Sequence, residues 1–335
     1  MSGGHADLRE SAGPAGDFQV AVPGRRFARV ALATVLVITA GYLFFRAYSL
    51  GTERVAWHVG RIVLALAPLP AVLWWAARRP AHPGQRAFSA SLLQDAAYFF
   101  LDLALRLSVL VLLAAGLGTF YESQLSFLTL HVGEVWPPWL RFTAAFLFMD
   151  FLGWMHHVVR HKVPLFWAFH TIHHSQEQMN FFTNARVHLL DTVIARLIIF
   201  VPMLTVKLSP PVIFGFAILM AWHRCIYHSN LRTNYGWLRY LLVTPQSHRI
   251  HHSTLPEHHD RNFGVNLSIW DHLFGTQYRN YDDYPVTGLG DESFPHERSP
   301  RPVAVMETLV AQFLYPFERL LATEAESGAL VPERH

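Results

Sequence analysis

Two long runs without a charged residue constrain the fold of this chain most strongly. Residues 30–45 and 62–77 each contain 16 uncharged, mostly apolar residues, and arginines flank both runs. A helix needs about 20 apolar residues to cross the hydrocarbon core of a bilayer. Flanking arginines can reach the membrane surface and make up the difference. The runs therefore predict two transmembrane helices, with buried helices of a soluble protein as the alternative.

The composition agrees with a membrane protein. Hydrophobic residues make up 52% of the chain and charged residues 15%, whereas soluble domains average about 45–50% and about 25%. The arginines are scattered rather than clustered, which argues against nucleic-acid binding. The single cysteine, Cys225, excludes an intramolecular disulfide and any cysteine-based zinc or iron–sulfur site.

Two further spans complete a predicted bundle of four transmembrane helices. Residues 92–117 include Asp102 and Arg106, which share a helix face and can neutralise each other. Residues 139–154 form the fourth span, with tryptophans suited to the membrane interface. Basic loops favour the cytoplasm, which places the N-terminal tail and residues 78–86 inside. Four crossings then return the chain to the cytoplasm just before the histidines begin.

Two shorter apolar arms, residues 192–206 and 211–222, flank a Ser-Pro-Pro sequence. Neither arm is long enough to cross alone, so we expect a shallow helical hairpin that returns His223 and His228 to the cytoplasmic side. Farther along, apolar residues recur at helical spacing through residues 306–321. This pattern predicts an amphipathic helix that lies on the bilayer or on the protein core.

The expected fold is therefore an all-α integral membrane protein with four transmembrane helices, the shallow hairpin and a cytoplasmic helical cap. The cap would hold a histidine-rich dimetal site. The predicted segments are a disordered N-terminal tail (1–24), transmembrane helices 1–3 with the start of helix 4 (25–144), a histidine-rich domain (145–280), and a C-terminal tail with the amphipathic helix (281–335).

Histidine is the compositional outlier, because 15 of the 21 histidines lie within residues 156–272. They include one H-x-x-x-H pair and two H-x-x-H-H boxes, and spacings of three and four place side chains on one face of a helix. Each box can then offer two or three ring nitrogens in one direction. The pair is His157 and His161, and the boxes are His170, His173, His174 and His248, His251, His252.

Convergence of these histidines points to metal binding. Imidazole is the commonest metal-binding side chain. A cluster of bare imidazoles would be costly, because each buried unpaired polar group costs about 1–3 kcal/mol, and protonating several would add repulsion. Nine imidazoles can hold two metal ions with positions open for O2. Imidazole ligation alone suits zinc, copper, nickel or iron.

The residues around the histidines resemble the sterol desaturase and fatty acid hydroxylase superfamily, over about residues 145–280. The matching stretches are DFLGWMHHVVRHKVP (150–164), FWAFHTIHHSQEQMN (166–180), YHSNLR (227–232), TPQSHRIHHS (244–253) and RNFGVNLSIWDHLFGT (261–276). The resemblance implies that the metal ligands are His157, His161, His170, His173, His174, His228, His248, His251 and His252, with His223 as a tenth candidate.

The resemblance also implies two iron ions that use O2 to attack an unactivated C–H bond of a membrane lipid of sterol, fatty acyl or isoprenoid type. Hydroxylation and desaturation both stay open. The expected partners are the lipid and a separate ferredoxin or cytochrome b5-like electron donor. The expected location is the bacterial inner membrane, with the active site facing the cytoplasm. The alternatives are a zinc or other non-redox lipid metalloenzyme, and a non-catalytic lipid- or metal-binding membrane protein.

The chain departs from the family pattern at its first pair. The family usually has His-Arg where this chain has His157-Val158, and an aromatic residue is common where it has His156. Either histidine could therefore be the first ligand. The spacing of four to His161 favours His157.

Ligating histidines normally donate their second ring N–H to a carboxylate or a carbonyl. Polar residues in the matched stretches are candidates for that contact, although an ordinary structural hydrogen bond is an equal alternative for each. They are Asp150, Asn180, His188, Asp191, Asn262 and Asp271, together with Glu177, Arg186, Asp260 and Trp270.

Overall fold

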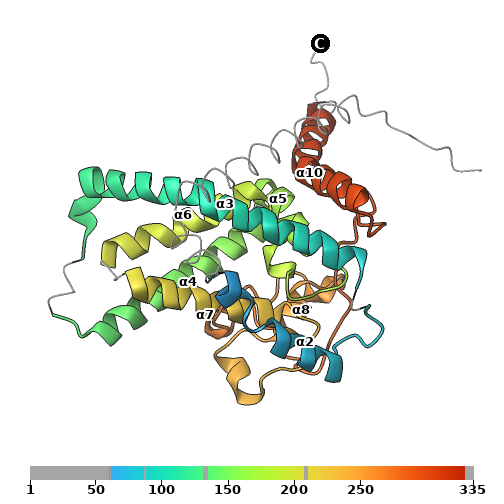
Figure 1. The fold of residues 1–335 in the computed structure, drawn as a ribbon, viewed down its shortest axis with the longest axis horizontal. Helices are drawn as coiled ribbons and strands as arrows, with labels where there is room; N and C mark the ends of the chain where they lie inside the picture. The colour runs from blue at the N-terminus through green and yellow to red at the C-terminus, as the bar shows by residue number, and fades with distance from the viewer. Residues whose placement is uncertain (1–59, 61, 87, 131–134, 207–209, 329–335) are drawn as a thin grey trace, which may run out of the picture.

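The computed structural model describes residues 60, 62–86, 88–130, 135–206 and 210–328 (Figure 1). Within these ranges the chain is helical and contains no β-strand. Extended segments meet there only at two isolated bridges, Leu242 with Leu267 and Ser253 with Thr287. The predicted all-α class is confirmed. The first predicted span, residues 30–45, lies outside the described residues.

Long helices form the larger part of the structure (Figure 1). The second apolar run is helical from Ile62 to Arg78, and its C-terminal part is α2 (Leu69–Arg78). Helix α3 (Ala90–Phe120) begins where the Ser89 side chain accepts a hydrogen bond from the backbone N–H of Leu92, as expected of an N-cap. Helix α3 continues into the short helices η1 (Tyr121–Leu125) and η2 (Ser126–Leu128).

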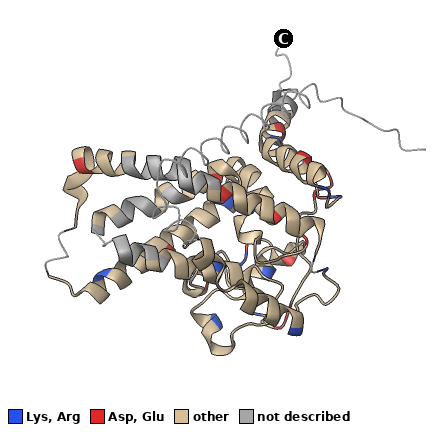
Figure 2. Cartoon of the chain, in the orientation of Figure 1, with Lys and Arg blue, Asp and Glu red and all other residues tan. Residues whose placement is uncertain are grey.

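The predicted spans 92–117 and 139–154 lie within α3 and α4 (Pro138–Lys162), respectively. Among the described residues, α4 is the one helix that is both long and apolar enough to cross a membrane, and the helix from Ile62 to Arg78 is shorter. Charged residues are sparse along the middle of α4 (Figure 2). One of the four predicted crossings therefore has support from length and composition, and the number four stays a prediction.

The predicted hairpin corresponds to α6 (Leu189–Val206) and α7 (Pro210–Tyr227), each of 18 residues. Both helices are longer than their apolar arms, because polar residues at the ends facing the histidines continue them. Helix α6 packs against α4. The connection between the two helices, residues 207–209, lies outside the described residues.

A cap of short helices and loops lies at the histidine-bearing end of α4. In chain order its helices are α5 (Pro164–His174), η4 (Thr183–Ala185), η5 (Gly236–Tyr240), α8 (Pro245–His251), η6 (Pro256–His258) and α9 (Ile269–Phe274). Helix α8 starts with a capping box, in which the side chains of Thr244 and Ser247 each accept from the other residue's backbone N–H. This cap fixes where the histidines of the second box begin.

The predicted C-terminal amphipathic helix is α10 (Pro302–Gly328). Leu309 and Tyr315 of α10 are buried in one apolar cluster with Tyr98 of α3 and Ile172 of α5. The face that carries Leu309 therefore packs on the protein core, which decides between the two surfaces that the sequence left open. Because Ile172 lies between the histidines of the first box, α10 also supports that box from behind.

Candidate metal centre

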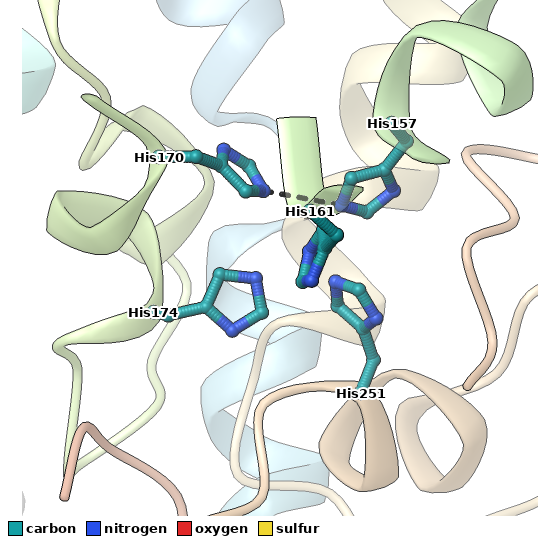
Figure 3. A group of neighbouring side chains, drawn as sticks. All are labelled: His157, His161, His170, His174 and His251. Carbon is teal, nitrogen blue, oxygen red and sulfur yellow. Dashed lines mark hydrogen bonds between the residues drawn. The ribbon is translucent and has the colours of Figure 1, made fainter. Parts of the chain in front are cut away.

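The nine histidines that the resemblance nominated as ligands form two compact groups, and in each group one ring nitrogen per residue lies within 4.8 Å of the others. The first group is His157, His161, His170, His174 and His251 (Figure 3). The second group is His173, His228, His248 and His252. His223 and His156 belong to neither group. His223 instead contacts the backbone carbonyl of Val243 through Nε2 at 2.9 Å.

The histidine boxes do not map one to one onto the two groups. In α5, His170 and His174 point to the first group and His173 to the second. In α8 and its C-terminal cap, His251 points to the first group, while His248 and His252 point to the second. Each box thus offers two nitrogens in one direction, the lower of the two numbers expected, and its remaining histidine joins the other group. Residues four apart share a direction, and the third diverges, so both helices serve both groups.

In the second group, the Nε2 atoms of His173 and His228 face each other, and neither carries a hydrogen. Nδ1 of His173 lies 3.2 Å from the carbonyl oxygen of Arg186, and Nδ1 of His228 lies 2.7 Å from that of Arg224. A carbonyl oxygen only accepts, so each Nδ1 must carry the hydrogen. In the neutral ring Nε2 then has a lone pair, and the two Nε2 atoms are 3.2 Å apart. Without a cation between them, these lone pairs repel each other.

The first group repeats the arrangement. Nδ1 of His157 donates to the carbonyl oxygen of Phe263 at 2.8 Å, and Nδ1 of His170 donates to a carboxylate oxygen of Asp191 at 3.2 Å. Their Nε2 atoms are 3.2 Å apart. Nδ1 of His251 likewise donates to the carbonyl oxygen of Arg261 at 2.8 Å. Five of the nine imidazoles are thus held in the tautomer that aims a lone pair into a group.

Protonation does not resolve this repulsion. Burial lowers the pKa of His170, His173 and His174 well below the ordinary value, and neighbouring positive charge, much of it from other imidazoles, lowers it further. Metal ions fit instead. Nitrogen–metal bonds are about 2.0–2.1 Å long for zinc, so ligands on one ion lie roughly 3 Å from each other. Nε2 of His248 lies 2.8 Å from that of His228 and 3.0 Å from that of His252.

The loop after α8 provides two of the accepting carbonyls. Asp260 and Asn262 both have left-handed backbones, with φ of 59° and 56°, a region that Asp and Asn tolerate better than most residues. This conformation lets Arg261 and Phe263 turn their carbonyls to His251 and His157. The Asn262 side chain fixes the loop, because its Nδ2 donates to Ser247 O at 2.8 Å and its Oδ1 accepts from Tyr278 N at 2.8 Å.

Two buried carboxylates hold the next part of this loop against α4. Asp271 accepts from the backbone N–H groups of Phe263 and Gly264 at 2.9 and 2.7 Å, and from Trp154 Nε1 at 3.0 Å. Asp150 accepts from the backbone N–H groups of residues 266 and 267 and from Trp270 Nε1. Neither carboxylate contacts a histidine of the two groups. They position the segment whose carbonyl reaches His157.

Of the six nominated supporting residues, only Asp191 touches a histidine of the two groups through its side chain. Its second oxygen pairs with Arg160 Nε at 2.7 Å, which steadies the carboxylate beside His170. Asn180 bonds to Asp95. His188 accepts from the backbone N–H of Leu190 and packs beside aromatic rings of α10. For Asn180 and His188, as for Asp150, Asn262 and Asp271, the structure favours the other alternative, an ordinary structural hydrogen bond.

The sequence reasoning named only Arg186 from a buried charge network behind the site. Arg186, whose carbonyl accepts from His173, is fully buried and pairs with Asp95 of α3 at 3.1 Å and with Glu297. Arg186 Nε also donates to the carbonyl of Ile172 and to Ser175 Oγ at the end of α5. A further signal was Asp95, an acidic residue near the start of a mostly apolar span. Glu297 shows that the C-terminal segment contributes to the support of the site.

The comparisons with known proteins agree with this site. Residues 142–276 match the fatty acid hydroxylase family, and this range includes all nine histidines of the two groups. This match covers 135 of the 335 residues, and over that range it supports the resemblance to the sterol desaturase and fatty acid hydroxylase superfamily. No solved structure gives a significant match to the chain.

Curated members of the superfamily align with part of the chain. An alkylglycerol monooxygenase of Caenorhabditis elegans is 33% identical over 153 residues, which is 45% of this chain and 30% of that protein. The ornithine lipid hydroxylase OlsE of Rhizobium tropici is 28% identical over 196 residues, 55% of this chain and 59% of OlsE. Human alkylglycerol monooxygenase is 31% identical over 180 residues, 54% and 37% of the two chains. The alignments thus span less than two thirds of each relative.

The left-handed backbone at Asn262 gives a stability prediction. Asn262→Ala and Asn262→Gly both remove the side-chain bonds, but only glycine adopts positive φ without penalty. We expect the alanine variant to be less stable than the glycine variant by about 1 kcal/mol, and to retain less metal. Denaturant unfolding in detergent and metal analysis measure the two effects. Equal stability of the two variants would show that the backbone conformation carries no strain.

The buried neutral imidazoles give a pH prediction for the metal-free protein. Burial lowers the pKa of His251 from 6.5 to about 4. Between these values the unfolded chain binds more protons than the folded one, so stability falls as the pH is lowered from about 6.5 toward 4, and is unaffected by this group above that window. The slope is up to about 1.4 kcal/mol per pH unit for each such histidine. Melting temperatures of metal-free protein at pH 7.5 and 5.5 test this, and His251→Asn should show a shallower dependence.

Proposed function

We propose that this chain hydroxylates a membrane lipid with O2 at a pair of histidine-ligated iron ions. The proposal rests on one observation. In each of the two histidine groups, which both draw on α5 and α8, imidazole Nε2 atoms direct their lone pairs at one another. The first ion would be held by His157, His161, His170, His174 and His251, and the second by His173, His228, His248 and His252. The irons would supply O2 reduction and hydrogen abstraction from a C–H bond, which no amino-acid side chain provides.

The donor set alone does not choose iron, because imidazole also suits zinc, copper and nickel. Iron is favoured because the aligned relatives are named as a monooxygenase and a hydroxylase, and insertion of oxygen needs a redox metal. The same names favour hydroxylation over desaturation, and lipids over soluble substrates. An ether lipid or an aminoacyl lipid is therefore the first class to try.

A small cavity of about 100 Å³ lies against both groups and would take the reacting part of the lipid. Its lining includes His157, His170, His173, His228 and His248 of the two groups. The other lining residues are Arg160, Asn184, Val187, Arg224, Tyr227, Gly264 and Val265. Tyr227 donates its hydroxyl hydrogen to Val265 O at 2.8 Å. The lining residues would position the reacting carbon and restrict the entry of water. The carbonyls and the Asp191 carboxylate that accept from Nδ1 would keep each imidazole in its tautomer.

A membrane location follows from α4. The helix is long and apolar enough to cross, and large apolar side chains along its outer surface, such as Phe148 and Met155, are exposed to 50% and 43%. His157 and His161 lie at its C-terminal end, so the metal centre would lie at one membrane surface. We propose the cytoplasmic surface of a bacterial inner membrane, four crossings in all, and a separate ferredoxin or cytochrome b5-like electron donor.

The test is His173→Ala with His259→Ala as the control. His173 belongs to the second group, whereas His259 is an exposed histidine outside both. Protein purified from iron-replete cells should contain two irons per chain, and cells that carry it should form a lipid product labelled from ¹⁸O2. His173→Ala should lose most of one metal ion and at least about 100-fold of the activity, while His259→Ala should keep both.

Three other outcomes would contradict the proposal. Zinc in place of iron, with a modified lipid that contains no label, would indicate a non-redox lipid metalloenzyme. An unlabelled alkene product would indicate desaturation. Unchanged lipids and no O2 uptake with lipid and reductant would indicate a lipid- or metal-binding protein without catalysis.

A further inference from the structure

A second, larger cavity lies on the opposite face of α4 from the metal centre. It has a volume of about 520 Å³, within the range of ligand sites, and lies where α4 and α6 run side by side (Figure 1). Helices α4, α5 and α6 each contribute to its wall. The lining residues are Phe148, Leu152, Met155, His156, Val159, Phe166, Ile194, Ile198 and Thr205. No charged residue is among them, so the cavity suits hydrocarbon.

His156 and Thr205 are the two polar residues of this mostly apolar wall, and His156 lies at the end nearer the metal centre. Its side chain is only 8% exposed, and its Nε2 atom is buried with no hydrogen-bond partner among the residues that the structure describes. A buried polar atom without a partner destabilises the fold, and a hydrocarbon environment offers no water to replace the partner. An aromatic ring at this position would pack equally well without that penalty. We therefore expect the cavity to bind a ligand with a polar atom that forms a hydrogen bond to His156 Nε2.

We propose that this α4–α6 cavity binds one hydrocarbon chain of a neutral oxygenated lipid, with an ester, ether or hydroxyl oxygen hydrogen-bonded to His156 Nε2. The apolar lining recognises the chain, and the unpaired imidazole nitrogen recognises the oxygen. A charged head group is disfavoured, because no charged side chain is among the lining residues that the structure describes.

The position of His156 also says how the lipid lies. The lining residues Phe148, Leu152, Met155 and Val159 follow one face of α4 and span about 16 Å along its axis. His156 lies near the Val159 end, next in sequence to His157 of the metal centre. One turn farther, Arg160 lines the small cavity at the metals. The oxygenated end of the lipid thus lies at the depth of the metal centre, and the chain extends away from it.

The test is photolabelling of the protein as purified from iron-replete cells, in detergent. One probe is a monoacylglycerol with a diazirine in its acyl chain, and the other is an alkane of equal length with the same diazirine. Peptides from α4 and α6 are quantified by mass spectrometry. The variants are His156→Phe, which keeps the shape and removes the polar atom, and His156→Asn, which restores a hydrogen-bonding group. Leu152→Trp fills the cavity, and Leu147→Trp is its control at a residue of α4 outside the lining.

The monoacylglycerol should label these peptides saturably in the natural protein. His156→Phe should raise its half-saturating concentration about 2- to 10-fold, and His156→Asn should restore most of the affinity. The alkane should bind the natural protein, His156→Phe and His156→Asn with equal affinity. Leu152→Trp should abolish saturable labelling by both probes, and Leu147→Trp should leave it unchanged.

Two results would overturn the inference: no saturable labelling of α4 and α6, or identical affinity of the monoacylglycerol for the natural protein and for His156→Phe. The second result would also mean that solvent satisfies the imidazole. Because labelling needs neither metal nor turnover, it is independent of the oxygenation assay. Labelling without an oxygenated product would support the lipid site and contradict the proposed function. An oxygenated product without labelling would support the proposed function and contradict the lipid site.

Discussion

The structure depends on one electrostatic conflict, the facing of imidazole lone pairs in a buried space. Carbonyls of Phe263, Arg261, Arg186 and Arg224 hold the Nδ1 hydrogens of four histidines and so aim the Nε2 lone pairs inward. Each of these contacts is favourable by itself, and together they create repulsion that only a bound cation removes. Metal binding is thereby coupled to the packing of the surrounding backbone. A shift of any one of these carbonyls changes the orientation of the histidine that it binds, although the histidine itself is unchanged.

This coupling explains why most of the buried acidic residues near the site bind the backbone segments that support the histidines, and not the histidines themselves. Asp271 and Asp150 bind backbone N–H groups of the segment that presents the Phe263 carbonyl. Asp95 and Glu297 bind Arg186, whose carbonyl meets His173. Both sets join elements that are far apart in the sequence. The fold therefore uses buried acids mainly to place backbone carbonyls, and among the described residues only Asp191 contacts a histidine of the two groups through its carboxylate.

Sequence reasoning found the histidines but misjudged their supports, for a physical reason. Spacings of three and four are a property of the helix, so the residues of the groups can be read from the chain. The split of His170 and His174 from His173 also follows from helical geometry and could have been predicted, since neighbours in sequence diverge by about 100°. Contacts made by backbone carbonyls leave no mark in residue identity. The left-handed Asn262 shows this, because its side chain acts on the loop while its neighbours' carbonyls act on the histidines.

The consecutive histidines at residues 156 and 157 show how α4 separates two chemical environments. His157 faces the metal centre. Its Nδ1 donates to the carbonyl oxygen of Phe263, and its Nε2 faces Nε2 of His170. His156 points about 100° away, into an apolar cavity where its Nε2 has no hydrogen-bond partner among the described residues. The spacing to His161 was enough to choose between them as a ligand. His156, the residue that this choice rejected, carries the unpaired imidazole nitrogen that a lipid would meet in the α4–α6 cavity. The departure from the family pattern at this position is therefore better explained by lipid recognition than by metal binding.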